Sequence, residues 1–155
     1  MEAQTIIKKL QLKDQSRPVL ILNSPGEYNE IIGSMEAEVH TTAKAEGYHF
    51  VQVFGTSNEE LRTLAKKAAS LIEEDGLLWL SYPKKSSKKY KGSDCNRDEI
   101  AYFLGEEGFE PVRMVAIDEN WSALRFRDVD KIKKLTRKTA ATAKGKKRVE
   151  GNKGC

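Results

Sequence analysis

The apolar residues of this chain form two patterns: short continuous runs, and longer stretches in which they recur every three or four positions. Continuous runs occupy residues 18–22, 50–54 and 77–82. Such runs are typical of strands that are buried on both faces of a parallel sheet. The run at 77–82 ends abruptly at Pro83 and a lysine-rich segment. Because open α/β sheets bind ligands just beyond the carboxyl ends of their strands, this end is the first candidate for a site.

The stretches with helical spacing separate these runs. The clearest begins after Ser57, a suitable N-cap with Glu60 three residues later, and its apolar stripe continues to Ile72. Further helices are expected over residues 35–47, 97–107 and 129–138. The helix over 97–107 has Asn96 as its N-cap.

Two alternating segments near the end of the chain, residues 112–117 and 121–127, are separated only by a short turn. Strands joined so briefly are antiparallel. The order of elements therefore predicts an α/β fold: a three-layer sandwich around a mostly parallel sheet of about five strands, with a C-terminal antiparallel hairpin. We expect one domain over residues 1–137 and a basic, flexible tail over 138–155.

Composition agrees with a globular domain, since 39% of the 155 residues are hydrophobic and 32% are charged. No apolar run approaches the ~20 residues of a membrane helix, and the N-terminus lacks a signal-peptide pattern. We therefore expect a cytoplasmic protein without membrane contact. Cys95 and Cys155 are the two cysteines, and they form neither a disulfide framework nor a spacing typical of a metal site. No metal and no cofactor are expected.

The net charge of +4 hides an asymmetry. Residues 131–155 carry ten basic side chains and one acidic one, whereas the first 130 residues carry 17 basic and 22 acidic ones. A basic tail of this kind attracts nucleic acid in a salt-dependent manner that is independent of sequence. It contains no aromatic residue for base stacking, so only weak contact is expected. The residues expected to make it are Lys144, Lys146, Lys147 and Arg148.

The lysine-rich segment after Tyr82 is the candidate binding site for an anion. Cationic side chains near a helix N-terminus favour a phosphate or a carboxylate. The residues proposed for this site are Lys84, Lys85, Ser86, Lys88, Asn96 and Arg97. A mobile, solvated loop is the alternative, because the segment lacks the glycine spacing of a phosphate-binding P-loop.

Other residues are weaker candidates for a functional role. A supporting polar cluster could include Asp98, Asp118, Ser122, Arg125 and Arg127, although pairs of Asp and Arg more often have a structural role. Trp79 and Trp121 are assigned to the core rather than to ring stacking. Cys95 lies among cations, which would favour a thiolate, but no base can be identified to activate it.

Several segments together resemble the second half of a Rossmann-type methyltransferase. They are residues 50–54, the helix after Ser57, residues 74–83, residues 108–112 and the final hairpin. The resemblance implies a methyltransferase-like architecture. The first half departs from that pattern, because residues 23–26, Asn-Ser-Pro-Gly, stand where a glycine-rich turn with a cofactor-facing acid would be. The resemblance thus implies an altered site for S-adenosylmethionine.

The chain also resembles, from Lys8 to Arg148, a family of small bacterial proteins classed as a domain of unknown function. The segments that carry this resemblance are residues 8–10, 22–25, 78–84, 96–98, 115–118, 121–127, 132–137 and 145–148. This family implies no activity.

The sequence therefore favours a binding or regulatory module whose partner is an anionic small molecule or a partner segment. One alternative is a methyltransferase-like enzyme with a degenerate cofactor site. Another is an accessory protein that contacts nucleic acid through its tail.

Overall fold

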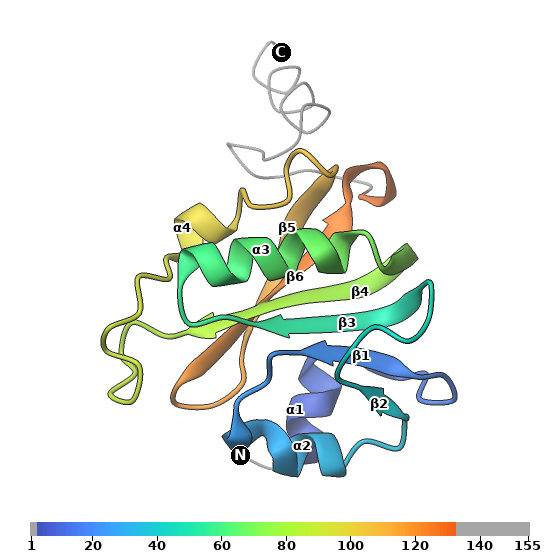
Figure 1. Cartoon of the computed structure of the whole chain (residues 1–155), viewed down its shortest axis with the longest axis horizontal. Helices are drawn as coiled ribbons and strands as arrows, with labels where there is room; N and C mark the ends of the chain where they lie inside the picture. Colours follow the sequence, from blue (N-terminus) through green and yellow to red (C-terminus); the bar gives the residue numbers. More distant parts are fainter. Residues whose placement is uncertain (1–2, 133–155) are drawn as a thin grey trace.

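The computed structural model describes residues 3–132 and contains a six-stranded mixed sheet (Figure 1). The strands are β1 (Val19–Leu22), β2 (Val39–His40), β3 (Tyr48–Phe54), β4 (Ile72–Pro83), β5 (Phe109–Ala116) and β6 (Trp121–Asp128). Their order across the sheet is β2-β1-β3-β4-β6-β5, with β2, β1, β3 and β4 parallel and β6 antiparallel to both of its neighbours. The predicted α/β class and the C-terminal hairpin are confirmed.

Helices cover both faces of this sheet. They are α1 (Ala3–Lys9), α2 (Asn29–Gly33), α3 (Asn58–Ala69) and α4 (Arg97–Ile100), with 3₁₀ turns η1 (Gly26–Tyr28) and η2 (Val129–Lys131). Residues of α3 and α4 pack with Leu78 and Leu80 of β4 in one core, whereas α1 and α2 pack with Trp79 in the other. Because successive strand residues point to opposite faces, the two cores lie on opposite sides of the sheet and give three layers.

Strand β4 is an interior strand, as its continuous apolar run predicts. Its last six residues, Leu78 to Pro83, are all buried, and all of them pair with β6, while the first four also pair with β3. Trp79 is fully buried, and its indole N–H donates a hydrogen bond of 3.0 Å to the carbonyl oxygen of Leu10. The tryptophan therefore joins the sheet to the segment after α1.

The predicted capping residues set the start of α3. The hydroxyl of Ser57 accepts a hydrogen bond of 3.1 Å from the backbone N–H of Glu60. In return, the Glu60 carboxylate accepts a hydrogen bond of 2.9 Å from the backbone N–H of Thr56. Gly55, just before this cap, lies tightly against the helix. A Cβ atom at Gly55 would be 2.8 Å from the Cβ and 2.9 Å from the Cα of Leu61.

The structure corrects three predicted helices. The segment 35–47 is not helical, and it contains only the two residues of β2; the helix of this region is α2, which ends at Gly33. The helix predicted over 97–107 ends at Ile100 and continues as turns. Helix α3 ends at Ala69, and Ile72 already belongs to β4. Only η2 falls within the described part of the helix predicted over 129–138.

Candidate functional site at the carboxyl edge of the sheet

The direction of chain progression reverses between β1 and β3. From β1 the chain moves outward to β2, and it then returns past β1 to form β3 on the other side. Such a reversal leaves a crevice beyond the carboxyl ends of the two strands, which is where open α/β sheets bind ligands. The residues that follow β1 and β3 are therefore placed to line such a crevice.

A crevice of about 600 Å³ lies at this reversal. Its walls come from the end of β1, the residue after β2, and the start of α3. The lining residues are Leu22, Asn23, Thr41, Ser57, Glu59, Glu60, Thr63 and Leu64. This volume is typical of sites for small molecules.

Hydroxyl, amide and carboxylate groups line the crevice beside the apolar side chains of Leu22 and Leu64. Asn23 adopts a left-handed backbone conformation with φ of 59°, and its side-chain amide donates a hydrogen bond of 2.9 Å to the carbonyl oxygen of Phe54, which ties the end of β1 to the end of β3. Thr41, Ser57 and Thr63 supply hydroxyl groups. The charged residues of the lining are Glu59 and Glu60, and no Lys, Arg or His is among them.

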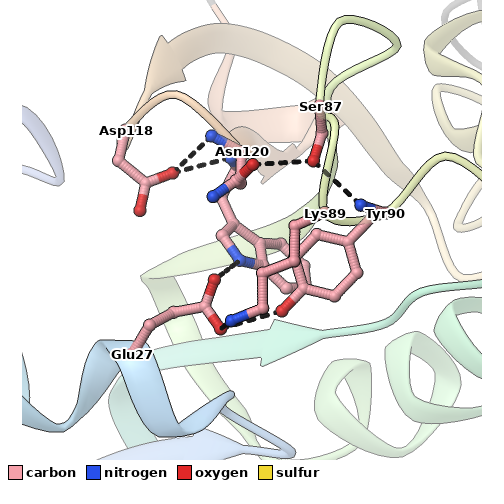
Figure 2. A network of polar contacts seen from close by, with 7 residues as sticks. Glu27, Ser87, Lys89, Tyr90, Asp118 and Asn120 are labelled. Atoms are coloured by element: carbon pink, nitrogen blue, oxygen red, sulfur yellow. Dashed lines mark hydrogen bonds and ion pairs between the residues drawn. The ribbon is translucent and has the colours of Figure 1, made fainter.

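A network around Glu27 occupies the neighbouring part of the edge (Figure 2). The carboxylate of Glu27, in η1 after β1, accepts hydrogen bonds of 2.8 Å from the Lys89 ammonium and of 2.8 Å from the Tyr90 hydroxyl. Its second oxygen accepts one of 3.2 Å from the indole N–H of Trp121 on β6. The ring of Trp121 packs edge to face against Phe54, so the network continues into the core. Glu27 thus holds the loop after β4 against the segment after β1.

Further bonds hold the same loop to the β5–β6 turn (Figure 2). The hydroxyl of Ser87 donates to the side-chain oxygen of Asn120 at 2.7 Å and accepts from the backbone N–H of Tyr90 at 3.1 Å. Asp118 shapes the turn by accepting bonds of 2.8 Å from the backbone N–H groups of Asn120 and Trp121. The loop after β4 is therefore fixed by partners on two other segments, η1 and the β5–β6 turn.

The Glu27 network predicts a pH dependence of stability. Burial raises the pKa of Glu27, but hydrogen bonds from Lys89, Tyr90 and Trp121 outweigh it and hold the pKa below its ordinary value of 4.5. A carboxylate whose pKa is lower in the folded state than in the unfolded state stabilises the fold at every pH above the unfolded-state pKa. This stabilisation is lost as the pH falls through the folded-state pKa. The melting temperature of Glu27→Gln should therefore lie below that of the wild type at pH 7 and approach it below about pH 4. Thermal unfolding from pH 7 to about pH 3 tests this, and a difference independent of pH would contradict it.

The residues predicted to bind an anion are divided between two cavities. Lys84, Lys85 and Asn96 line a cavity of about 280 Å³ beyond β4, together with Lys91, which the sequence analysis did not include. Ser86 and Lys88 are exposed and lie outside its lining. Arg97 lines a different cavity, of about 340 Å³, between α4 and β5. The structure thus groups three lysines and Asn96, without Arg97.

The residues of the predicted polar cluster do not come together at one site, although Arg125 and Arg127 share a face of β6. Asp98 lines the cavity between α4 and β5, whereas Asp118 lies in the β5–β6 turn. Ser122 pairs with Tyr82 across β6 and β4. Arg125 donates a hydrogen bond of 3.0 Å to the side chain of Gln11, and Arg127 forms an ion pair of 2.7 Å with Asp75.

The remaining candidate, Cys95, is buried. Burial raises the pKa of its thiol, so the environment does not favour the thiolate that a nucleophile needs. Among residues 3–132, no group of three His, Cys, Asp or Glu side chains is placed to hold a metal ion. Within the same range, no helix has the length and apolar character required to cross a membrane.

Solved structures with a similar fold are S-adenosylmethionine-dependent methyltransferases. The N-methyltransferase NodS from Bradyrhizobium japonicum WM9, in complex with S-adenosyl-L-homocysteine, gives a TM-score of 0.53 at 12% identity over 82% of this chain and 85% of that chain. A methyltransferase from Aquifex aeolicus gives a TM-score of 0.52 at 12% identity, over 83% of this chain and 90% of that chain. A putative sarcosine dimethylglycine methyltransferase from Galdieria sulphuraria gives a TM-score of 0.53 at 14% identity, over 84% of this chain and 85% of that chain.

These similarities show a Rossmann-type methyltransferase fold, with a mostly parallel sheet and a C-terminal antiparallel hairpin. No family model and no curated protein matches the chain. The resemblance to the small bacterial family of unknown function therefore rests on the sequence segments alone.

The turn after β1 does not fit a cofactor that lies across it. The turn contains Pro25, and Gly26 does not have a positive φ. A Cβ atom at Gly26 would meet no atom within 4 Å, so the turn is not a place where only glycine allows the chain to pass. The acid of this segment, Glu27, is bound by Lys89, Tyr90 and Trp121.

Proposed function

We propose that this chain is a binding domain with a methyltransferase-like fold, and that its ligand occupies the crevice between the ends of β1 and β3. The observation that carries this proposal is the crevice itself, about 600 Å³ in volume and placed where the strand order reverses. The altered turn after β1 favours binding without methyl transfer.

The lining indicates the chemistry of the ligand. The Thr41 hydroxyl and the acceptor oxygens of Asn23 and Thr63, whose donors bind the carbonyl oxygens of Phe54 and Glu59, suit a ligand that carries several hydroxyl groups. The carboxylates of Glu59 and Glu60 repel a negative charge, and no cation of the lining offsets them. The ligand is therefore a small, hydroxyl-bearing molecule without net negative charge.

Adenosine and adenosine monophosphate form a matched pair of probes, because they differ only in the phosphate group. Isothermal titration calorimetry should give a saturable interaction with adenosine and one about tenfold weaker, or none, with the monophosphate. The double variant Glu59→Gln and Glu60→Gln should bring the two affinities closer, since glutamine keeps the shape and the hydrogen-bond acceptor at position 60. Equal affinities for both probes, or no binding of adenosine, would overturn this proposal.

Two further measurements locate the ligand and test the enzymatic alternative. Thr63→Trp should abolish adenosine binding by filling the crevice, whereas Lys66→Trp, also exposed on α3 but outside the lining, should leave it unchanged. Incubation with S-adenosylmethionine labelled on its methyl group should transfer no label to a panel of hydroxyl and amine acceptors. Transfer would establish the alternative, a methyltransferase-like enzyme with a degenerate cofactor site.

The lysine-lined cavity beyond β4 supports a second candidate, the binding of an anionic small molecule. Lys84, Lys85 and Lys91 surround it, and Asp94 is its one carboxylate. If the monophosphate binds and Lys84→Ala with Lys91→Ala removes that binding, this cavity is the site. Weak contact with nucleic acid through the basic tail involves residues outside 3–132 and stays a prediction.

A further inference from the structure

The β5–β6 hairpin places three guanidinium groups on one face of the sheet, away from the carboxyl edge. Arg113 on β5 lies directly opposite Arg125 on β6, and directly opposite residues of antiparallel strands have their side chains on the same face. Arg127 is two positions further along β6 and shares this face. Since Arg125 also pairs with Trp79, which belongs to the core under α1, the face is that of α1.

One of the three arginines is neutralised by a carboxylate. Arg127 donates two hydrogen bonds, of 2.7 Å and 2.9 Å, to the two oxygens of Asp75. The hydrogen bond from Arg127 is also the main cause that lowers the pKa of Asp75. Both oxygens of Asp75 are thus hydrogen-bonded to Arg127, and Arg125 interacts with this carboxylate through charge alone.

The other two arginines have no such carboxylate. Arg125 donates from Nη1 to the neutral side chain of Gln11, and its Nε atom is buried without a hydrogen-bond partner. Burial is the main cause that lowers the pKa of Arg125, and the charges of Arg127 and Arg113 lower it as well, whereas the Asp75 carboxylate acts in the opposite direction. Arg113 is exposed, and within residues 3–132 its side chain forms no hydrogen bond or ion pair. Like charges directly opposite each other destabilise a sheet, and a buried unpaired donor adds a further cost.

The acids of this face do not offset all three arginines. Asp75 is paired with Arg127, and Glu110, which is buried, lies opposite Arg127 in the hairpin rather than opposite Arg113. We propose that Arg113 and Arg125 form an oxyanion site that binds a phosphate group between the two guanidiniums. Guanidinium groups bind phosphate with paired hydrogen bonds, and an anion here removes both the repulsion and the unpaired donor.

This site is independent of the crevice and of the lysine cavity. The crevice is lined from β1 and α3, and the lysine cavity lies beyond Pro83, whereas Arg125 pairs with Trp79 four residues before the end of β4. If the crevice binds no adenosine, phosphate can still bind between Arg113 and Arg125. If phosphate does not bind there, the crevice can still bind adenosine.

The test is a titration of the full chain with inorganic phosphate, followed through the Nε–Hε resonances of its arginines in proton–nitrogen NMR spectra. The Arg125 resonance should shift in a saturable manner, because its Nε–H gains an acceptor. Sodium chloride at the same ionic strength should not reproduce the shift. Arg113→Gln should weaken phosphate binding at Arg125 by about tenfold.

Arg62→Gln is the matched control, since Arg62 lies over the ring of Phe103 in the core of the other face, and phosphate binding should be unchanged in it. Arg125→Lys, which keeps the charge and loses the fork of donors, should bind phosphate more weakly while remaining folded. A shift that does not saturate, that chloride reproduces, or that survives Arg113→Gln would overturn the proposal.

Discussion

Replacing Trp79 by alanine is expected to lower the free energy of unfolding by about 3 to 5 kcal/mol. The side chain is fully buried in the interior strand β4. Its removal leaves a cavity between the sheet and α1, and the carbonyl oxygen of Leu10 loses its 3.0 Å hydrogen bond from the indole. Urea denaturation followed by circular dichroism measures the change.

Trp79→Phe separates packing from hydrogen bonding, because phenylalanine keeps an aromatic ring but lacks the indole N–H. Its cost should be smaller than that of alanine and should include about 1 to 3 kcal/mol for the unsatisfied carbonyl oxygen of Leu10. If alanine at position 79 cost less than about 1 kcal/mol, the interior placement of β4 would be wrong.

Gly55→Ala is expected to be the second most damaging change, with a loss of about 1 to 3 kcal/mol or more. The added Cβ would come within 2.9 Å of the backbone nitrogen and Cα of Leu61, and backbone atoms of a helix cannot move aside as a flexible side chain does. Helix α3 would have to shift away from the end of β3, and the crevice wall formed by Ser57 and Glu60 would move with it.

Gly26→Ala is the matched control for Gly55→Ala. A Cβ atom at Gly26 meets nothing within 4 Å, and the residue does not have a positive φ. Its substitution should change stability by less than about 1 kcal/mol, in the stabilising direction, because alanine restricts the unfolded chain. Thermal and urea unfolding of the two variants side by side would contradict the account if Gly55→Ala were as stable as Gly26→Ala.

The sequence predicts the middle of the fold well because local patterns determine it there. The apolar run at 77–82 identifies a strand with neighbours on both sides, and Ser57 with Glu60 marks the start of α3, since both signals depend on adjacent residues. In the segment 35–47, Met35 and Val39 recur at helical spacing and therefore predict a helix. In the structure Met35 instead packs in the core under the sheet, and Val39 pairs with β1. Periodicity in a short segment cannot distinguish these outcomes.

The candidate site was only partly predictable. A lysine-rich segment after a buried strand is visible in the sequence, and it does line a cavity with Asn96. The larger crevice is assembled from three separate segments, whose Asn, Thr, Ser and Glu residues are common types without a motif. Glu27 is 62 to 94 residues away in the sequence from its partners Lys89, Tyr90 and Trp121. No local sequence pattern predicts contacts over such separations.

We expect a ligand to bind where the strand order reverses, between β1 and β3. The decisive measurement is an adenosine titration followed through the backbone proton–nitrogen NMR spectra. Saturable shifts should cluster at Asn23, Thr41, Ser57 and Thr63, while Lys84 and Lys91 stay unchanged. Shifts that cluster at the lysine cavity instead, or the absence of any saturable shift, would contradict this expectation.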